Sequence, residues 1–120
     1  MAPTHRHRHT VFACGSLMSG LPYHQQLRGA RRIAQSLTLP DFHMFDLGRY
    51  PGVTRGGTTS IMGEVYQVTE RLLSQLDAFE GVPTLYHRQH ITLADGMPVQ
   101  LYVLTSAPNK PDERRIPSGD

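Results

Sequence analysis

Apolar residues at helical spacing predict one clear helix in the second half of the chain. The apolar run consists of Leu72, Leu73, Leu76 and Phe79. This i, i+1, i+4, i+7 pattern is typical of one buried helix face. Thr69 is a candidate N-cap before the run, and Glu70 suits the positive end of the helix. Gly81 can adopt the left-handed conformation that ends a helix, and Pro83 beyond it prevents continuation.

Strand signals dominate the rest of the sequence. Short apolar or alternating stretches are bounded by glycine, proline and aspartate. They predict strands at residues 10–14, 33–39, 42–46, 61–68, 87–93 and 99–105. Asp95-Gly96 is a good hairpin turn between the last two of these. About six strands with one main helix predict an α+β fold.

Two further segments depart from this strand pattern. Residues 21–28 predict a short helix that Gly29 ends. Residues 48–57 are rich in glycine and are broken by Pro51, so they predict irregular chain.

A chain of 120 residues has room for one hydrophobic core and therefore for one domain. We expect a flexible arm at residues 1–9, a folded domain at 10–106 and a C-terminal tail at 107–120. No apolar run approaches the roughly twenty residues of a membrane span, and residues 1–10 lack the hydrophobic stretch of a signal peptide. These features predict a cytoplasmic protein with no membrane partner.

Charge and cysteine content narrow the possible partners and compartment. The net charge of +2 is small, and much of the basic character lies near the two ends of the chain. Such a distribution argues against a nucleic-acid partner, which favours a basic face interleaved with aromatic residues. Cys14 is the only cysteine, so it cannot form an intrachain disulfide, and this fits a reducing compartment.

The acidic residue at the predicted helix end is the first candidate for chemistry. Glu80 directly precedes Gly81, where the partial negative charge of the helix C-terminus disfavours a carboxylate. Any burial raises the pKa of the carboxyl further, so Glu80 can exchange protons near neutral pH. Asp77 lies three residues earlier on the same side of the helix. Taken alone, the two acids fit a solvated face of an amphipathic helix better than a site.

The turn after the first predicted strand is the second candidate. Residues 10–14 run into Gly15 and Ser16. A glycine at such a turn lets the chain approach a ligand closely, and successive backbone N–H groups can bind a carboxylate or a developing oxyanion. On its own, a Gly-Ser turn is weak evidence for binding.

Several short motifs follow one another along the chain in a recognisable order. They are Cys14-Gly15-Ser16-Leu17, residues 18–27, Tyr50-Pro51-Gly52-Val53, residues 63–68, residues 76–83 and Tyr86-His87-Arg88. Their order resembles the gamma-glutamylcyclotransferase-like family, especially its gamma-glutamylamine cyclotransferase branch, over residues 11–103. The family's first motif is Tyr-Gly-(Ser/Thr)-Leu, so Cys14 stands in the place of its tyrosine.

The resemblance implies both a fold and a reaction. The implied fold is a small mixed sheet that closes into a barrel, with helices packed outside. The implied reaction releases 5-oxoproline and a free amine from a gamma-glutamyl amine or gamma-glutamyl amino acid, with Glu80 as general acid and base. The substrate-binding residues it implies are Cys14, Gly15, Ser16, Leu17, Tyr50, Pro51, Gly52 and Tyr86. It implies no metal and no organic cofactor, and its only partner is the small gamma-glutamyl substrate.

Tyr86 and Arg88 alternate on a predicted strand, so they share one face of it. We assign Tyr86 to the pocket wall, and a purely structural pair on an edge strand fits equally well. Glu64 is a further acid candidate on another strand, where we expect it to face solvent.

Cys14 and the N-terminal histidines leave other functions open. Without the family's tyrosine, the chain can also be a non-catalytic small-ligand-binding or scaffold protein that keeps the fold. Cys14 as a nucleophile is a weaker alternative, because no histidine partner can be assigned and a cysteine at a strand end is usually a small buried hydrophobe. His5, His7 and His9 alternate with Arg6 and Arg8, whose charges oppose a functional metal site.

Overall fold

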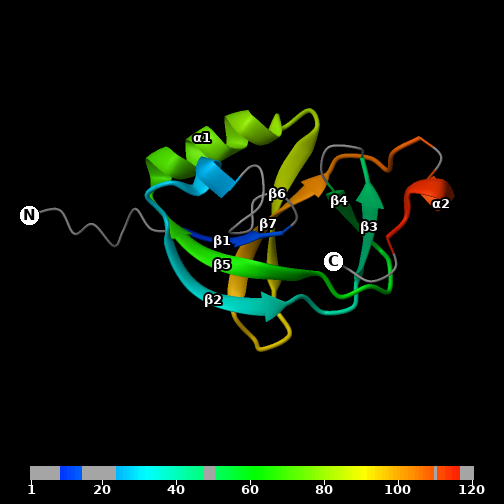
Figure 1. The fold of residues 1–120 in the computed structure, drawn as a ribbon, viewed down its shortest axis with the longest axis horizontal. Coiled ribbons are helices and arrows are strands. Elements are labelled where there is room, and N and C mark those ends of the chain that lie inside the picture. Colours follow the sequence, from blue (N-terminus) through cyan, green and yellow to red (C-terminus); the bar gives the residue numbers. More distant parts are fainter. Residues whose placement is uncertain (1–8, 15–23, 48–50, 110, 117–120) are drawn as a thin grey trace, which may run out of the picture.

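A five-stranded sheet forms the centre of the molecule, and a two-stranded sheet lies beside it (Figure 1). The computed structural model describes residues 9–14, 24–47, 51–109 and 111–116. The large sheet has the order β2-β5-β1-β7-β6. Its strands are β1 (His9–Ala13), β2 (Arg31–Leu37), β5 (Met62–Val68), β6 (Tyr86–Thr92) and β7 (Pro98–Leu104). β1 and β7 run parallel, and the other neighbours run antiparallel. The predicted α+β class is confirmed.

The small sheet contains a strand that the sequence pattern did not predict. β3 (Phe42–Asp46) was predicted, but β4 (Pro51–Arg55) lies within the segment predicted as irregular chain, and that prediction is wrong there. Proline is tolerated at the first residue of an edge strand, where its missing N–H is not needed. The pairings among the described strands form two separate sheets, so closure into a barrel stays a prediction.

The helices largely follow the sequence signals. α1 (Glu70–Glu80) begins after Thr69, whose side-chain oxygen accepts a hydrogen bond from the Leu72 N–H at 3.1 Å. Leu73 and Leu76 are buried under it, but Phe79 is 40% exposed, so the buried face is narrower than predicted. The short segment before Gly29 is a 3-10 helix, η3 (His24–Leu27). None of the helices in the described ranges is long and apolar enough to cross a membrane.

Each face of the large sheet has its own hydrophobic core, because successive strand residues point to opposite sides. The core between this sheet and the β3–β4 pair includes Phe12, Met44, Val53, Leu101 and Val103. The core between the sheet and α1 includes Val11, Tyr66, Leu73, Leu76, Tyr86 and Tyr102. In Figure 1, α1 lies along one side of the sheet and the β3–β4 pair lies at its other end. Polar side chains on the two faces of the large sheet therefore belong to two different surroundings, one beneath α1 and one beside the β3–β4 pair.

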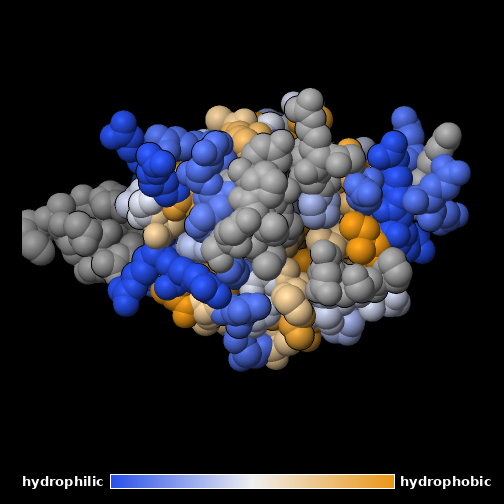
Figure 2. Space-filling model, in the orientation of Figure 1, coloured by the Kyte–Doolittle hydropathy of each residue, from blue (hydrophilic) through white to orange (hydrophobic). Residues whose placement is uncertain are grey.

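The segment predicted as a C-terminal tail contacts the small sheet. It contains the short helix α2 (Pro111–Arg114), and Ile116 packs against the core on the β3–β4 side. The Ile116 N–H donates to the Met44 carbonyl at 2.7 Å, and an Arg114 guanidinium N–H donates to the Asp46 carbonyl at 3.2 Å. Figure 2 shows hydrophilic side chains gathered over α2 at one end of this face and over the start of β2 at the other.

Glu64 does not face solvent as expected. Glu64 lies on β5 and is only 4% exposed. Its Oε1 accepts a hydrogen bond from the Tyr66 hydroxyl at 2.9 Å, and its Oε2 lies 3.3 Å from the Arg32 guanidinium. A carboxylate is buried when such partners replace water. Strand alternation alone could not tell which side of β5 held them.

Candidate active site

Glu80 is the last residue of α1, directly before the turn that leads to β6. Gly81 has φ 72°, so it adopts the left-handed cap conformation expected from the sequence, and its N–H donates to the Ala78 carbonyl at 3.2 Å. This cap holds Glu80 at the helix end. Glu80 is half-buried, and burial raises the pKa of its carboxyl from 4.5 to about 7. A carboxyl of this kind is partly protonated at neutral pH and can both accept and donate a proton.

An electrostatic interaction links the end of β1 to the end of α1. Cys14 directly follows β1 and is half-buried against the core on the β3–β4 side. Burial raises the pKa of its thiol to about 12, and the negative charge of Glu80 adds to this effect. The thiol is therefore protonated at neutral pH, which argues against Cys14 as a nucleophile. The charge of Glu80 thus acts on Cys14, the residue directly before the turn that the sequence singled out.

The remaining residues of the first predicted turn cannot be placed. Gly15, Ser16 and Leu17, and also Tyr50, lie outside the described residues.

Asp77 is the centre of a polar network beside Glu80. Its carboxylate accepts hydrogen bonds from the Arg88 guanidinium at 2.7 and 3.1 Å and from the Tyr102 hydroxyl at 2.7 Å. Another Arg88 N–H donates to the side-chain oxygen of Gln100. The paired contacts between a carboxylate and a guanidinium fix direction as well as distance. They tie the last turn of α1 to β6 and β7, and so help to hold Glu80 in place.

Tyr102 is a residue of this site that the sequence analysis missed. Burial raises the pKa of its phenol above the ordinary value, as do the hydrogen bond to Asp77 and the negative charges of Asp77 and Glu80. The positive charge of Arg88 opposes these effects. The phenol therefore remains a hydrogen-bond donor. Arg88 on β6 lies directly opposite Tyr102 on β7. The predicted hairpin turn at Asp95-Gly96 determines this register, so the pairing could have been inferred from the sequence.

Tyr86 and Arg88 share the α1 side of β6, as predicted. Tyr86 is buried in the core beneath α1, and it also lines a cavity of about 330 Å³ with Leu47, Leu85 and Leu104. Arg88 instead binds Asp77 within the network. The described lining of this cavity contains no charged side chain.

Pro51 and Gly52 begin β4 next to this neutral cavity. A Cβ on Gly52 would lie 2.7 Å from Leu104 and 2.9 Å from Leu47, both of which line the cavity. A side chain at this position would require the side chains of these two leucines to move. Gly52 therefore lies against two leucines that line the cavity, and its assignment to the substrate pocket stays a prediction.

Comparison with known sequences decides the family. The profile of the family described as gamma-glutamyl cyclotransferase, AIG2-like, matches residues 11–120. The chain belongs to this family. It is therefore an enzyme of the gamma-glutamylcyclotransferase type, as the motifs implied.

Relatives of this cyclotransferase include two mammalian enzymes. Gamma-glutamylaminecyclotransferase of Homo sapiens is 32% identical over 132 residues, covering 92% of this chain and 86% of the human one. The enzyme of the same name from Bos taurus is 32% identical over 120 residues, covering 89% of this chain and 71% of the bovine one.

A solved structure has the same fold as this cyclotransferase. The AIG2-like protein from Mus musculus superposes with a TM-score of 0.83, covering 95% of this chain and 89% of the mouse chain at 23% identity. The arrangement of α1 over a mixed sheet is thus the fold of a known structure.

Proposed function

We propose that this cyclotransferase releases 5-oxoproline and a free amine from a gamma-glutamyl amine or gamma-glutamyl amino acid, with Glu80 as general acid and base. The observation that carries the proposal is the half-buried carboxyl of Glu80, with a pKa of about 7, beside the end of β1. A group that titrates near the working pH is the most efficient at moving a proton in both directions. The names of the human and bovine relatives support the substrate class.

The reaction needs one proton to move between two nitrogens. The neutral α-amino nitrogen of the substrate attacks the γ-carbonyl carbon and forms the new C–N bond, while the C=O electron pair moves onto oxygen. The Glu80 carboxylate takes the proton that this nitrogen loses. The same proton then passes to the leaving nitrogen as its C–N bond breaks and the carbonyl re-forms. General acid–base catalysis of this kind contributes roughly 10²–10⁴-fold in rate.

Substrate anchoring is assigned to the segment that follows β1. In this proposal the backbone N–H groups of Gly15, Ser16 and Leu17 bind the α-carboxylate or the oxyanion, where donors are most effective. Tyr86 and Gly52 contribute the wall of the neutral cavity that borders the loop after Glu80. Tyr50 and Pro51 complete the proposed border. The single cysteine supports the cytoplasmic location predicted for the enzyme.

The proposal is tested by measuring 5-oxoproline release from a panel of gamma-glutamyl amines and gamma-glutamyl amino acids. Glu80→Gln should lose at least about 10²-fold in kcat/KM, because an amide of the same shape cannot transfer the proton. Glu113→Gln, at an exposed carboxyl in α2, is the matched control and should keep full activity. A folded Glu80→Gln protein that retains its activity would contradict the assignment.

The presence of Cys14 in place of the family's tyrosine supports a second candidate function. In this alternative the protein binds a gamma-glutamyl compound without catalysing a reaction. No 5-oxoproline release from folded protein across the panel would support this alternative. In that case calorimetry with the same panel would detect binding, and Cys14→Tyr would show whether the family's side chain restores turnover.

A further inference from the structure

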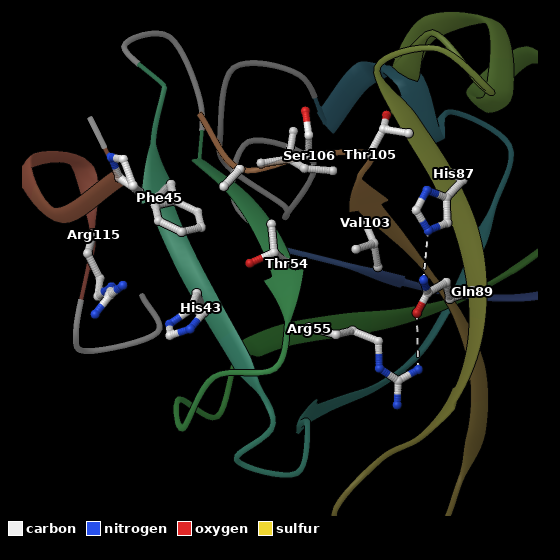
Figure 3. A pocket seen from close by; sticks show the side chains of 13 residues that line it. His43, Phe45, Thr54, Arg55, His87, Gln89, Val103, Thr105, Ser106 and Arg115 are labelled. Carbon is white, nitrogen blue, oxygen red and sulfur yellow. Dashed lines mark hydrogen bonds between the residues drawn. The ribbon is translucent and has the colours of Figure 1, made fainter. Parts of the chain in front are cut away.

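A second cavity lies along the face of β6 that is turned away from α1. It has a volume of about 520 Å³, which is in the range of sites for small molecules. Because strand residues alternate, Tyr86 and Arg88 face α1, whereas His87 and Gln89 line this cavity. In Figure 3 their side chains face β4 and β3, from which Arg55, Thr54 and His43 extend. The cavity is thus formed between the two sheets.

Basic and neutral polar groups line this cavity. Its described lining includes two arginines, two histidines and three hydroxyl residues, and none of the described lining residues is acidic. These polar residues are Arg55, Arg115, His43, His87, Thr54, Thr105 and Ser106. Phe45 and Val103 supply apolar surface between them (Figure 3). For a chain whose net charge is only +2, this is a marked local excess of positive charge.

A hydrogen-bonded chain fixes several of these side chains before any ligand arrives. An Arg55 guanidinium N–H donates to Gln89 Oε1 at 3.1 Å, and Gln89 Nε2 lies 2.7 Å from His87 Nε2 (Figure 3). A guanidinium can only donate, so the Gln89 oxygen must accept and its amide nitrogen must donate. Nε2 of His87 is then the acceptor, which puts the ring proton on Nδ1. The chain spans both sheets and presents further N–H donors.

The two arginines have little competition from carboxylates. Gln89 accepts a hydrogen bond from one of the five N–H donors of Arg55, and the guanidinium lies 5.7 Å from the centre of the Phe42 ring. The ion pairs among the described residues do not include Arg55, although Asp41 lines a neighbouring pocket with it. Arg115 lies 3.6 Å from Asp112, whose side chain is 93% exposed. An ion pair that exposed contributes little and yields readily to a better anion.

We propose that this cavity binds a small organic anion whose carboxylate or phosphate group is attracted by the charges of Arg55 and Arg115, which lie at its two ends (Figure 3), and whose apolar part packs on Phe45 and Val103. The part of the site lined by His87 and Gln89 lies on the face of β6 opposite Arg88, and the cavity adjoins the neutral cavity at Leu104, Thr105 and Ser106, which line both. The enzyme would then bind two ligands. The anion is recognised by its negative charge in this cavity, and the gamma-glutamyl substrate binds at the site that contains Glu80. Guanidinium groups suit carboxylate and phosphate equally, so the experiment separates these two chemistries.

The test is a titration of the full-length ¹⁵N-labelled protein, followed by NMR, with succinate, inorganic phosphate and the neutral analogue succinamide. We expect saturable shifts of the cavity-lining amides with at least one anion, at a Kd of about 1 mM or tighter, and none with succinamide. The anion that binds more tightly identifies the preferred group.

Two variants and two controls make the titration specific. Arg115→Gln removes an exposed charge, and Gln89→Glu places a carboxylate of nearly the same shape next to Arg55. Each should weaken anion binding roughly tenfold or more. Arg71→Gln, at an exposed arginine on α1, should bind as the parent protein does.

Glu80→Gln should also bind the anion normally, which separates this site from catalysis. The inference is overturned if neither anion saturates, if succinamide binds equally well, or if folded Arg115→Gln and Gln89→Glu bind unchanged. Because the readout is binding, a failure to find 5-oxoproline release leaves the result of this test intact.

Discussion

The Glu80 carboxyl holds its proton more tightly in the folded protein than in the unfolded chain. Its pKa rises from 4.5 to about 7 on folding, because the partly buried site disfavours the charged form. Between these two pH values the folded state binds a proton that the unfolded state has lost. The free energy of unfolding must therefore fall as the pH rises through this range.

This linkage predicts a difference between the parent protein and Glu80→Gln. The stability of the parent should fall by about 1–3 kcal/mol relative to that of the variant between pH 4.5 and about 7. Urea unfolding at several pH values measures this difference. A difference between the two proteins that does not change with pH would show that Glu80 titrates normally.

The ion pair between Asp77 and Arg88 offers a second prediction at the same scale. Their side chains are only 24% and 30% exposed, whereas those of Asp112 and Arg115 are 93% and 43% exposed. A double-mutant cycle to alanine should give a coupling of about 1–2 kcal/mol for the first pair and less than about 0.5 kcal/mol for the second. Equal couplings would mean that the paired hydrogen bonds at Asp77 add no stability.

The sequence predicts single residues well only when their role follows from local structure. Glu80 follows from a helix stop, and its raised pKa was expected for that reason. Tyr102 and Gln100 join the site through the pairing of β6 with β7, which requires the register of two strands. The burial of Glu64 depends on Arg32 in a neighbouring strand, so its strand alone could not reveal it.

Among the elements, α1 is the one whose ends were predicted most closely. Both Thr69 and Gly81 act as caps, and six of the seven strands overlap predicted ones. β4 was missed because Pro51 and Gly52 are typical of loops, and their role depends on contacts with β7 that are distant in sequence. Local patterns thus predict an element when its own residues stabilise it.

The cap of α1 leads to a prediction about Gly81. Gly81→Ala should lower stability by about 1–2 kcal/mol, because an L-residue is strained at φ 72° and its Cβ would lie 3.1 Å from Leu85. It should also lower kcat by displacing Glu80. Gly96→Ala, at φ 92° with nothing within 4 Å of the added carbon, is the control. It should cost stability by strain alone and leave kcat unchanged, as thermal unfolding and the 5-oxoproline assay will show.

At the scale of the whole molecule, the proposed domain boundaries can be tested by shortening the chain. A fragment of residues 10–106 contains α1 and all seven strands, and it lacks only the first residue of β1, His9. We therefore expect it to fold. It lacks Ile116, which packs against the core on the β3–β4 side, and should be about 1–3 kcal/mol less stable. Circular dichroism and urea unfolding measure both effects. An unfolded fragment would extend the domain to residue 116.

The side chains of β6 contribute to two different surfaces, one on each face of the strand. Tyr86 and Arg88 belong to the α1 side, and His87 and Gln89 belong to the cavity between the sheets. A point substitution in this strand changes one surface, but inserting or deleting a single codon exchanges the two sets of side chains. Odd-numbered and even-numbered positions of β6 are therefore under separate structural constraints, while both surfaces constrain the length of the strand.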